Sequence, residues 1–187
     1  MKHISYPKFI EFNGYHYSVG HYDDGIYTPI INKIIDQLEA FNSHHKKMLV
    51  FRLDLHQKKI GFKPANELMT SFFTQFKNLL KKGKKLTMLG YCWVREQNKS
   101  TSPHYHLVLM VDGQKHQHPK YLIDDARTVW ESLDGTIYDP SRHYNIRKDR
   151  HKEIGEMIVA VLYLAKVWTK DNRNRALTAN DYSTSRI

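Results

Sequence analysis

Apolar residues recur along this chain with two different periods, and each period predicts one kind of element. Spacings of three and four residues place apolar side chains on one face of a helix. They occur in four segments, 28–41, 65–80, 121–133 and 153–168. Thr28 and Pro29 suit an N-cap and a first helical position, and Gly83 follows the second segment as a stop. The sequence therefore predicts four amphipathic helices.

Alternation of apolar and polar residues, the period of a β-strand, marks other segments. Asn13-Gly14, a strong two-residue hairpin signal, separates two short aromatic-rich stretches at 9–12 and 15–19. Further strands are expected at 48–55, 86–95, 104–111 and 143–147. Together with the four helices, these strands indicate an α+β protein.

Length and composition favour a single globular domain, 1–187, with a polar basic tail from about residue 171. The hydrophobic content is 41%, and 12% of the residues are aromatic. No apolar run approaches the roughly 18 residues of a membrane span, and residues 1–6 lack the apolar core of a signal peptide. We expect a cytoplasmic protein without membrane contact.

The formal net charge of +10 predicts a polyanionic partner, with nucleic acid as the first candidate. The alternative is a soluble basic protein without a specific partner. Lysines at 77, 81, 82, 84 and 85 either contact phosphates or form a solvated helix end. Cys92, the single cysteine, is expected to be a buried, inert thiol.

Candidate chemistry begins in the segment 93–111, which predicts a β-hairpin that presents a metal ion. His104 and His106 are two residues apart on a strand and therefore project from the same face. Glu96 ends the preceding strand, and the polar loop 98–103 returns the chain beside the histidines. Two histidines and one carboxylate with open coordination positions suit a catalytic divalent ion.

Two histidines at this spacing also occur without a metal. The alternative interpretation is that His104 and His106 are hydrogen-bonded side chains at a sheet surface and bind no metal. His116 and His118 repeat the spacing, but polar neighbours place them in a loop, and we do not assign them. The apolar run 107–111 distinguishes the first pair, because it fixes their strand and hence their direction.

The strand at 48–55 ends in a second polar face. Arg52, Asp54 and His56 alternate with apolar residues and project together. They are expected to reach the metal directly or to orient its ligands from behind, and Asp54 is the strongest candidate. The alternative is an ordinary ion pair between Arg52 and Asp54 on a sheet surface.

Tyr163 and Lys166 lie three residues apart in the fourth predicted helix and would share one of its faces. A tyrosine can act as a covalent nucleophile, although a phenol with a pKa of about 10 needs a cation or a metal-polarised substrate nearby. Lys166 would supply that cation or bind a phosphate. The alternative is a core tyrosine with a lysine that extends to solvent.

In this order, the segments resemble the three motifs of the HUH endonuclease superfamily. They are most similar to the replication initiators of filamentous (inovirus-type) phages and their prophage relatives. The matching residues are Arg-Leu-Asp-Leu-His at 52–56, Trp-Val-Arg-Glu-Gln at 93–97, Pro-His-Tyr-His at 103–106 and Tyr-Leu-Ala-Lys-Val-Trp-Thr-Lys at 163–170. The resemblance implies a ferredoxin-like or RRM-like fold, with a central antiparallel sheet of about five strands flanked by helices.

The resemblance also implies a metal-dependent nickase that joins its tyrosine to the 5′ phosphate of single-stranded DNA and starts rolling-circle replication of a phage or mobile element. His104, His106 and Glu96 would bind Mg²⁺ or Mn²⁺, Tyr163 would be the nucleophile, and Lys166 would assist it. Arg52 and Lys170, within the matching segments, are expected to contact DNA.

The implied partners are single-stranded DNA or an origin hairpin, with a separate helicase and polymerase, because the chain contains no Gly-Lys-Ser/Thr phosphate-binding loop. Position 167 is Val, so one tyrosine is available, which implies a single-tyrosine mechanism or a dimer. Two other functions stay open: a non-catalytic module that binds single-stranded nucleic acid, and a nickase-derived antagonist that binds another element's origin.

Overall fold

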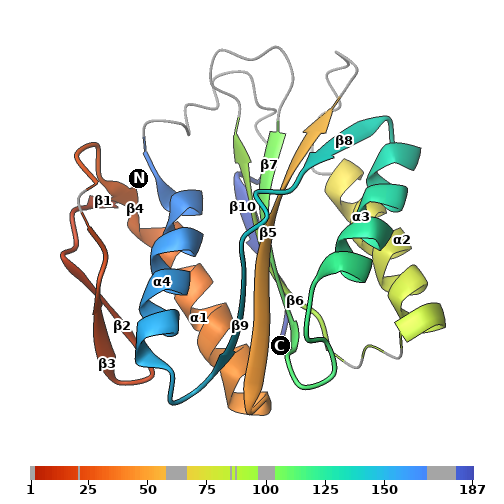
Figure 1. Cartoon of the computed structure of the whole chain (residues 1–187). Coiled ribbons are helices and arrows are strands. Elements are labelled where there is room, and N and C mark those ends of the chain that lie inside the picture. Colours follow the sequence, from red (N-terminus) through yellow and green to blue (C-terminus); the bar gives the residue numbers. More distant parts are fainter. Residues whose placement is uncertain are drawn as a thin grey trace.

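An antiparallel sheet runs through the middle of the molecule, with helices on both of its faces (Figure 1). The computed structural model describes residues 3–20, 22–57, 67–84, 86, 88–96, 104–167 and 180–187. The sheet has six strands, in the spatial order β10 (Tyr182–Thr184), β6 (Gly90–Glu96), β7 (His104–Asp112), β5 (Lys47–Gln57) and β8 (Gly135–Tyr138), with β9 (His143–Arg147) also paired to β5.

The centre of this sheet is formed by β5 and β7, whose side chains are buried on both faces because helices cover each side. The two strands pair from Met48 opposite Asp112 to His56 opposite His104. Leu53 and its alternating neighbours face one helical layer, whereas Val50 faces the other. The predicted alternation at 48–55 is thereby confirmed.

Each face of the sheet is covered by one pair of helices (Figure 1). The first pair is α1 (Thr28–His44) and α4 (His151–Leu162), and the second is α2 (Glu67–Lys84) and α3 (Lys120–Ser132). Their apolar stripes contribute the buried residues of two separate cores, one on each face of the sheet. A polar side chain at one end of the sheet therefore points either toward the layer of α1 and α4 or toward the layer of α2 and α3.

The N-terminal strands form small ribbons beside the first helical layer (Figure 1). β2 (Phe9–Phe12) and β3 (Tyr15–Ser18) pair across the predicted turn, where Asn13 and Gly14 both have positive φ angles, 51° and 77°. β1 (Ile4–Ser5) pairs with β4 (Ile26–Tyr27). The Tyr17 hydroxyl lies 2.9 Å from Nδ1 of His151, which ties the first ribbon to α4.

The prediction of an α+β fold with helices flanking an antiparallel sheet is confirmed. In the described part of the chain, all four predicted helices are present, and the sheet has six strands rather than five. The pattern analysis missed β8 and β10 of this sheet, and also the two short strands β1 and β4. β10 falls within the segment predicted to be a polar tail, and its residues pair with Cys92 to Val94 of β6. Among the described residues, we find no helix with the length and apolar character needed to cross a membrane.

The prediction that one helix extends from 153 to 168 is wrong at its C-terminal end. α4 ends at Leu162 and continues as one 3-10 turn, η1 (Tyr163–Ala165), after which Lys166 is extended, with ψ of 136°. The reason is a tertiary contact: Lys166 forms a bridge with Ile26, and the Val167 N–H donates to the Gly25 carbonyl at 3.3 Å. The pairing of residues 166–167 with residues 25–26 replaces the helical hydrogen bonds that the local spacing of apolar residues favours.

Candidate functional site

The strand register gathers the predicted site residues at one end of the sheet. His104, at the start of β7, lies opposite Glu96 on β6 and opposite His56 on β5. His106 lies one row further in, opposite Asp54. Because paired residues project to the same face, all of these side chains point toward the layer of α1 and α4. The prediction that the two histidines share one face is confirmed.

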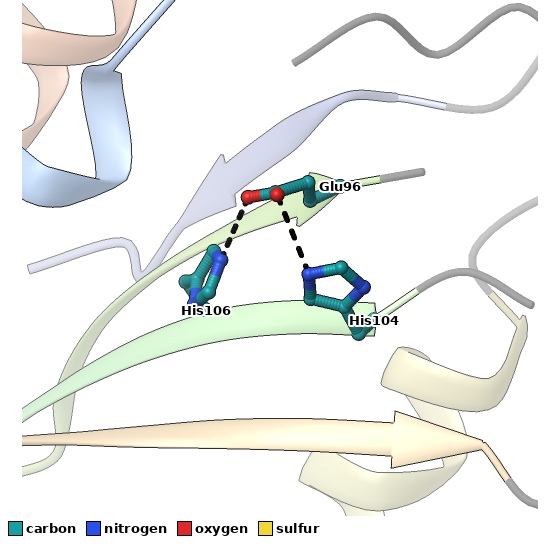
Figure 2. Close-up of side chains that lie close together, drawn as sticks. All are labelled: Glu96, His104 and His106. Carbon is teal, nitrogen blue, oxygen red and sulfur yellow. Dashed lines mark hydrogen bonds and ion pairs between the residues drawn. The ribbon is translucent and has the colours of Figure 1, made fainter. Parts of the chain in front are cut away.

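Glu96 and the two histidines form one compact group (Figure 2). A Glu96 carboxylate oxygen, Oε2, lies 2.8 Å from Nε2 of His106, and Oε1 lies 3.5 Å from Nε2 of His104. One ligand atom from each residue lies within 4.8 Å of the others, and Glu96 and His106 are buried. The geometry fits a metal ion, because one carboxylate and two imidazoles supply three ligand atoms that are close enough to share it. In the described ranges no other group of three His, Cys, Asp or Glu side chains has this geometry, and His116 and His118 do not form one.

Asp54 supports His106 from the opposite side. Nδ1 of His106 lies 2.7 Å from Oδ1 of Asp54, and Nη2 of Arg52 donates to Oδ2 at 2.9 Å. Burial works to raise the pKa of Asp54, but the hydrogen bond and charge of His106, with the Arg52 guanidinium, outweigh it and lower that pKa. The Asp54 carboxylate can accept a hydrogen bond from Nδ1 of His106, and Nε2 is the nitrogen directed to Glu96.

His56 packs against the group through the ring of His104. The two rings stack with centroids 5.2 Å apart and an interplanar angle of 15°. Burial lowers the pKa of His56, and the neighbouring His104 adds to the decrease. His56 is therefore a neutral packing partner for His104 at ordinary pH, rather than a member of the metal-ligating group.

Tyr163 lies against this group although it comes from a different part of the chain. Its ring meets His106 edge to face, with centroids 5.2 Å apart. The Arg52 guanidinium carbon is 4.3 Å from the Tyr163 ring centroid, and Nζ of Lys166 is 4.6 Å from it. The helical face predicted for Tyr163 and Lys166 does not exist, but η1 still brings the two side chains together.

The charges around Tyr163 oppose one another. Burial raises the pKa of its phenol, the Glu96 carboxylate raises it further, the Arg52 guanidinium lowers it, and Asp54 raises it slightly. The phenol is therefore protonated at neutral pH, because its pKa is raised from an ordinary value of about 10.

The hairpin loop 98–103, Lys85, Lys170 and positions 171–179 of the predicted tail lie outside the described residues. The sequence analysis missed the wall on another side of Tyr163, where Tyr22, Arg142 and Tyr144 line a cavity. Arg142 and Tyr144 are two residues apart around the start of β9, whereas Tyr22 comes from a distant segment. Only the tertiary fold identifies Tyr22 as their neighbour.

Comparison with known families gives one match, which spans nearly the whole chain. Residues 11–178 match the family model described as the YagK/YfjJ C-terminal domain, a family of prophage-associated proteins. The matched range includes Asp54, Glu96, His104, His106 and Tyr163. Searches of curated proteins and of solved structures gave no significant match.

Proposed function

We propose that this chain, which belongs to the YagK/YfjJ C-terminal domain family, is a metal-dependent nickase that attaches Tyr163 to the 5′ phosphate of single-stranded DNA. One observation carries the proposal. Tyr163, the candidate nucleophile, packs directly on His106 of the Glu96–His104–His106 group, with ring centroids 5.2 Å apart. A nucleophile and a metal-ligating group in contact are the two components that such a reaction needs.

Glu96, His104 and His106 would bind Mg²⁺ or Mn²⁺ through one carboxylate and two Nε2 atoms. When bound, the ion would draw negative charge from the scissile phosphate and offset the Glu96 charge that raises the pKa of Tyr163. Asp54 would hold the proton on Nδ1 of His106, and His56 would fix the ring of His104 by stacking.

The Tyr163 oxygen would form a bond to phosphorus while the bond from phosphorus to the 3′ oxygen breaks. The phenol releases its proton and the leaving oxygen takes one up, so the products are a tyrosyl ester and a free 3′ hydroxyl. Arg52 and Lys166 lie beside the Tyr163 ring and would stabilise both the phenolate and the charge on the phosphate.

The net charge of +10 supports single-stranded DNA or an origin hairpin as the substrate. The prophage association of the family supports a role in starting rolling-circle replication of a phage or mobile element in the bacterial cytoplasm. The free 3′ hydroxyl would prime a separate polymerase, and a separate helicase would unwind the duplex. Lys170 is proposed as a further DNA contact.

The test is a denaturing gel of protein incubated with Mn²⁺ and a pool of single-stranded DNA that includes the native element. We expect a slower band that survives SDS in the wild type and is absent in Tyr163→Phe, because phenylalanine has no nucleophilic oxygen. The double variant His104→Ala/His106→Ala should also lose the band while keeping most DNA affinity. An undiminished band in Tyr163→Phe would remove that residue from the reaction.

One observation favours a second function, a non-catalytic module or an origin-binding antagonist. Both ring nitrogens of His106 already lie within hydrogen-bond distance of carboxylates, Asp54 and Glu96, so a protonated imidazole satisfies the network without any metal. Calorimetry with Mn²⁺ separates the two functions. A nickase requires metal binding that His104→Ala weakens, whereas a binding module would take up DNA without metal and yield no covalent adduct.

A further inference from the structure

Tyr163 also lines a cavity of about 520 Å³ that lies between α4, β5 and β9. Among the described residues, none of the three candidate metal ligands lines it. Its polar wall consists of three tyrosines and three cations, Tyr22, Tyr144, Tyr163, Arg52, Arg142 and Lys166. We call it the tyrosine pocket. Its volume lies within the range of roughly 300–1,000 Å³ that is usual for small-ligand sites.

The two tyrosines other than Tyr163 are fixed by the fold. Tyr144 on β9 lies opposite Val50 on β5 and therefore projects from the same face as Arg52. The Tyr22 hydroxyl donates to the Val159 carbonyl of α4 at 3.4 Å. Both rings are half-buried and pack against the apolar core. They present rigid aromatic surface, which costs little conformational entropy when a ligand binds.

Lys166 connects the tyrosine pocket to the nucleophile. Its Nζ lies 4.6 Å from the Tyr163 ring centroid and 5.8 Å from the Tyr22 ring centroid. A phosphate near the Tyr163 oxygen would thus have a cation beside it that also borders the pocket. Apolar surface from Val50 and Val161 completes the lining.

We propose that the tyrosine pocket binds the base and sugar of the nucleotide that adjoins the scissile phosphate, and that Tyr22 and Tyr144 stack on that base. This inference rests on the proposed function. The chemistry fits a single nucleotide, because aromatic rings stack on bases, apolar side chains accept the sugar, and Arg142 and Lys166 attract the flanking phosphates. A purely apolar ligand would leave those cations without a role.

The first measurement is independent of cleavage. In a Tyr163→Phe background with EDTA, fluorescence anisotropy reports binding of the single-stranded DNA pool. We expect Tyr22→Leu and Tyr144→Leu each to weaken binding about tenfold, because leucine packs but does not stack on a base. Tyr22→Phe and Tyr144→Phe should bind like the parent, which separates lost stacking from lost folding. Tyr121→Leu, at an exposed position on α3, is the matched control.

The second measurement uses oligonucleotides that span the cut site sequenced from the adduct. In the parent protein, an abasic residue on one side of the scissile phosphate should weaken binding about tenfold. In Tyr144→Leu the same abasic residue should not weaken binding further, because the stacking contact is already lost. Unchanged affinity in both leucine variants would overturn the pocket assignment. If the adduct forms while those variants bind normally, only this inference fails. If the variants lose affinity while no adduct forms, only the proposed nickase activity fails.

Discussion

At the scale of single residues, His106 is the best-defined part of the site. Asp54 and Glu96 reach its two ring nitrogens from neighbouring strands, at 2.7 Å and 2.8 Å. The pKa of Asp54 is lowered despite burial, so this side chain is an anion throughout the neutral range. In the proposed site Asp54 would orient His106 rather than bind the metal itself, since it is not in the candidate metal-ligating group of the described residues.

Substitution of Asp54 by Asn tests this orienting role. The amide keeps the shape of the carboxylate but loses its charge, so the Nδ1 proton of His106 is less firmly fixed. We expect the affinity for Mn²⁺ to fall about 10- to 100-fold, measured by titration calorimetry. Asp124→Asn is the matched control, because this exposed carboxylate on α3 forms a surface ion pair with Arg127. Equal Mn²⁺ affinity in wild type and Asp54→Asn would show that His106 needs no such support.

At the scale of elements, α3 and β8 contact the end of β5 and hold it in place. Nε1 of Trp130 donates to the backbone carbonyl of His56 at 3.0 Å. Gly135, which opens β8, lies so close that an added Cβ would be 2.1 Å from Nε1 of Trp130. This close approach explains why β8 begins with glycine, and it links the packing of α3 to the strand that carries Asp54 and His56.

Gly135→Ala should therefore destabilise the fold, because the buried Trp130 ring has no room to move. We expect the free energy of unfolding in urea to decrease by about 1–3 kcal/mol. Gly83→Ala is the control with the opposite sign: an added Cβ meets nothing within 4 Å, and alanine favours helix α2 by about 0.5–1 kcal/mol. A neutral Gly135→Ala would mean that Trp130 does not constrain β8.

The sequence predicted helices and strands better than it predicted which residues of different strands lie opposite one another. Alternation along 104–111 showed which face carries His104 and His106, because side-chain direction follows from the strand period. The period does not specify register, so neither the Asp54–His106 pair nor the stack of His56 on His104 was predictable beyond a shared face. β10 was missed because it is short and polar, and it is a strand only through pairing with β6.

The candidate metal ligands and the candidate nucleophile differ in how far the sequence could predict their positions. Glu96, His104 and His106 lie close in sequence on one hairpin, and local pattern sufficed to group them. Tyr163 reaches them only because α4 ends at Leu162 and the following backbone pairs with Gly25 and Ile26. That contact joins distant parts of the chain and has no local signal.

The prediction for the single cysteine required only burial. Cys92 is fully buried, which raises the pKa of its thiol to about 12, as expected for an inert side chain.

At the scale of the whole molecule, the two faces of the sheet offer different cationic surfaces. Arg52 and Lys166 lie beside Tyr163, on the side covered by α1 and α4. Lys81 and Lys82 belong to α2, which covers the opposite face. If single-stranded DNA reaches Tyr163 as proposed, we expect it to pass the first pair of cations and to leave the end of α2 solvated. Both interpretations of the lysines at the end of α2 stay predictions, and the salt dependence of binding tests them.

We expect single-stranded DNA binding to weaken steeply with salt, because each neutralised phosphate releases counterions and contributes about −0.7 to the slope of log K against log salt concentration. The variant Arg52→Gln/Lys166→Gln should reduce that slope by about 1.4, since two phosphate contacts are lost. Lys81→Gln/Lys82→Gln removes the same charge from the other face and should leave the slope unchanged. Anisotropy titrations at several salt concentrations measure all three proteins. If the α2 variant lowered the slope and the site variant did not, the DNA would follow the α2 face, and Tyr163 could not be its nucleophile.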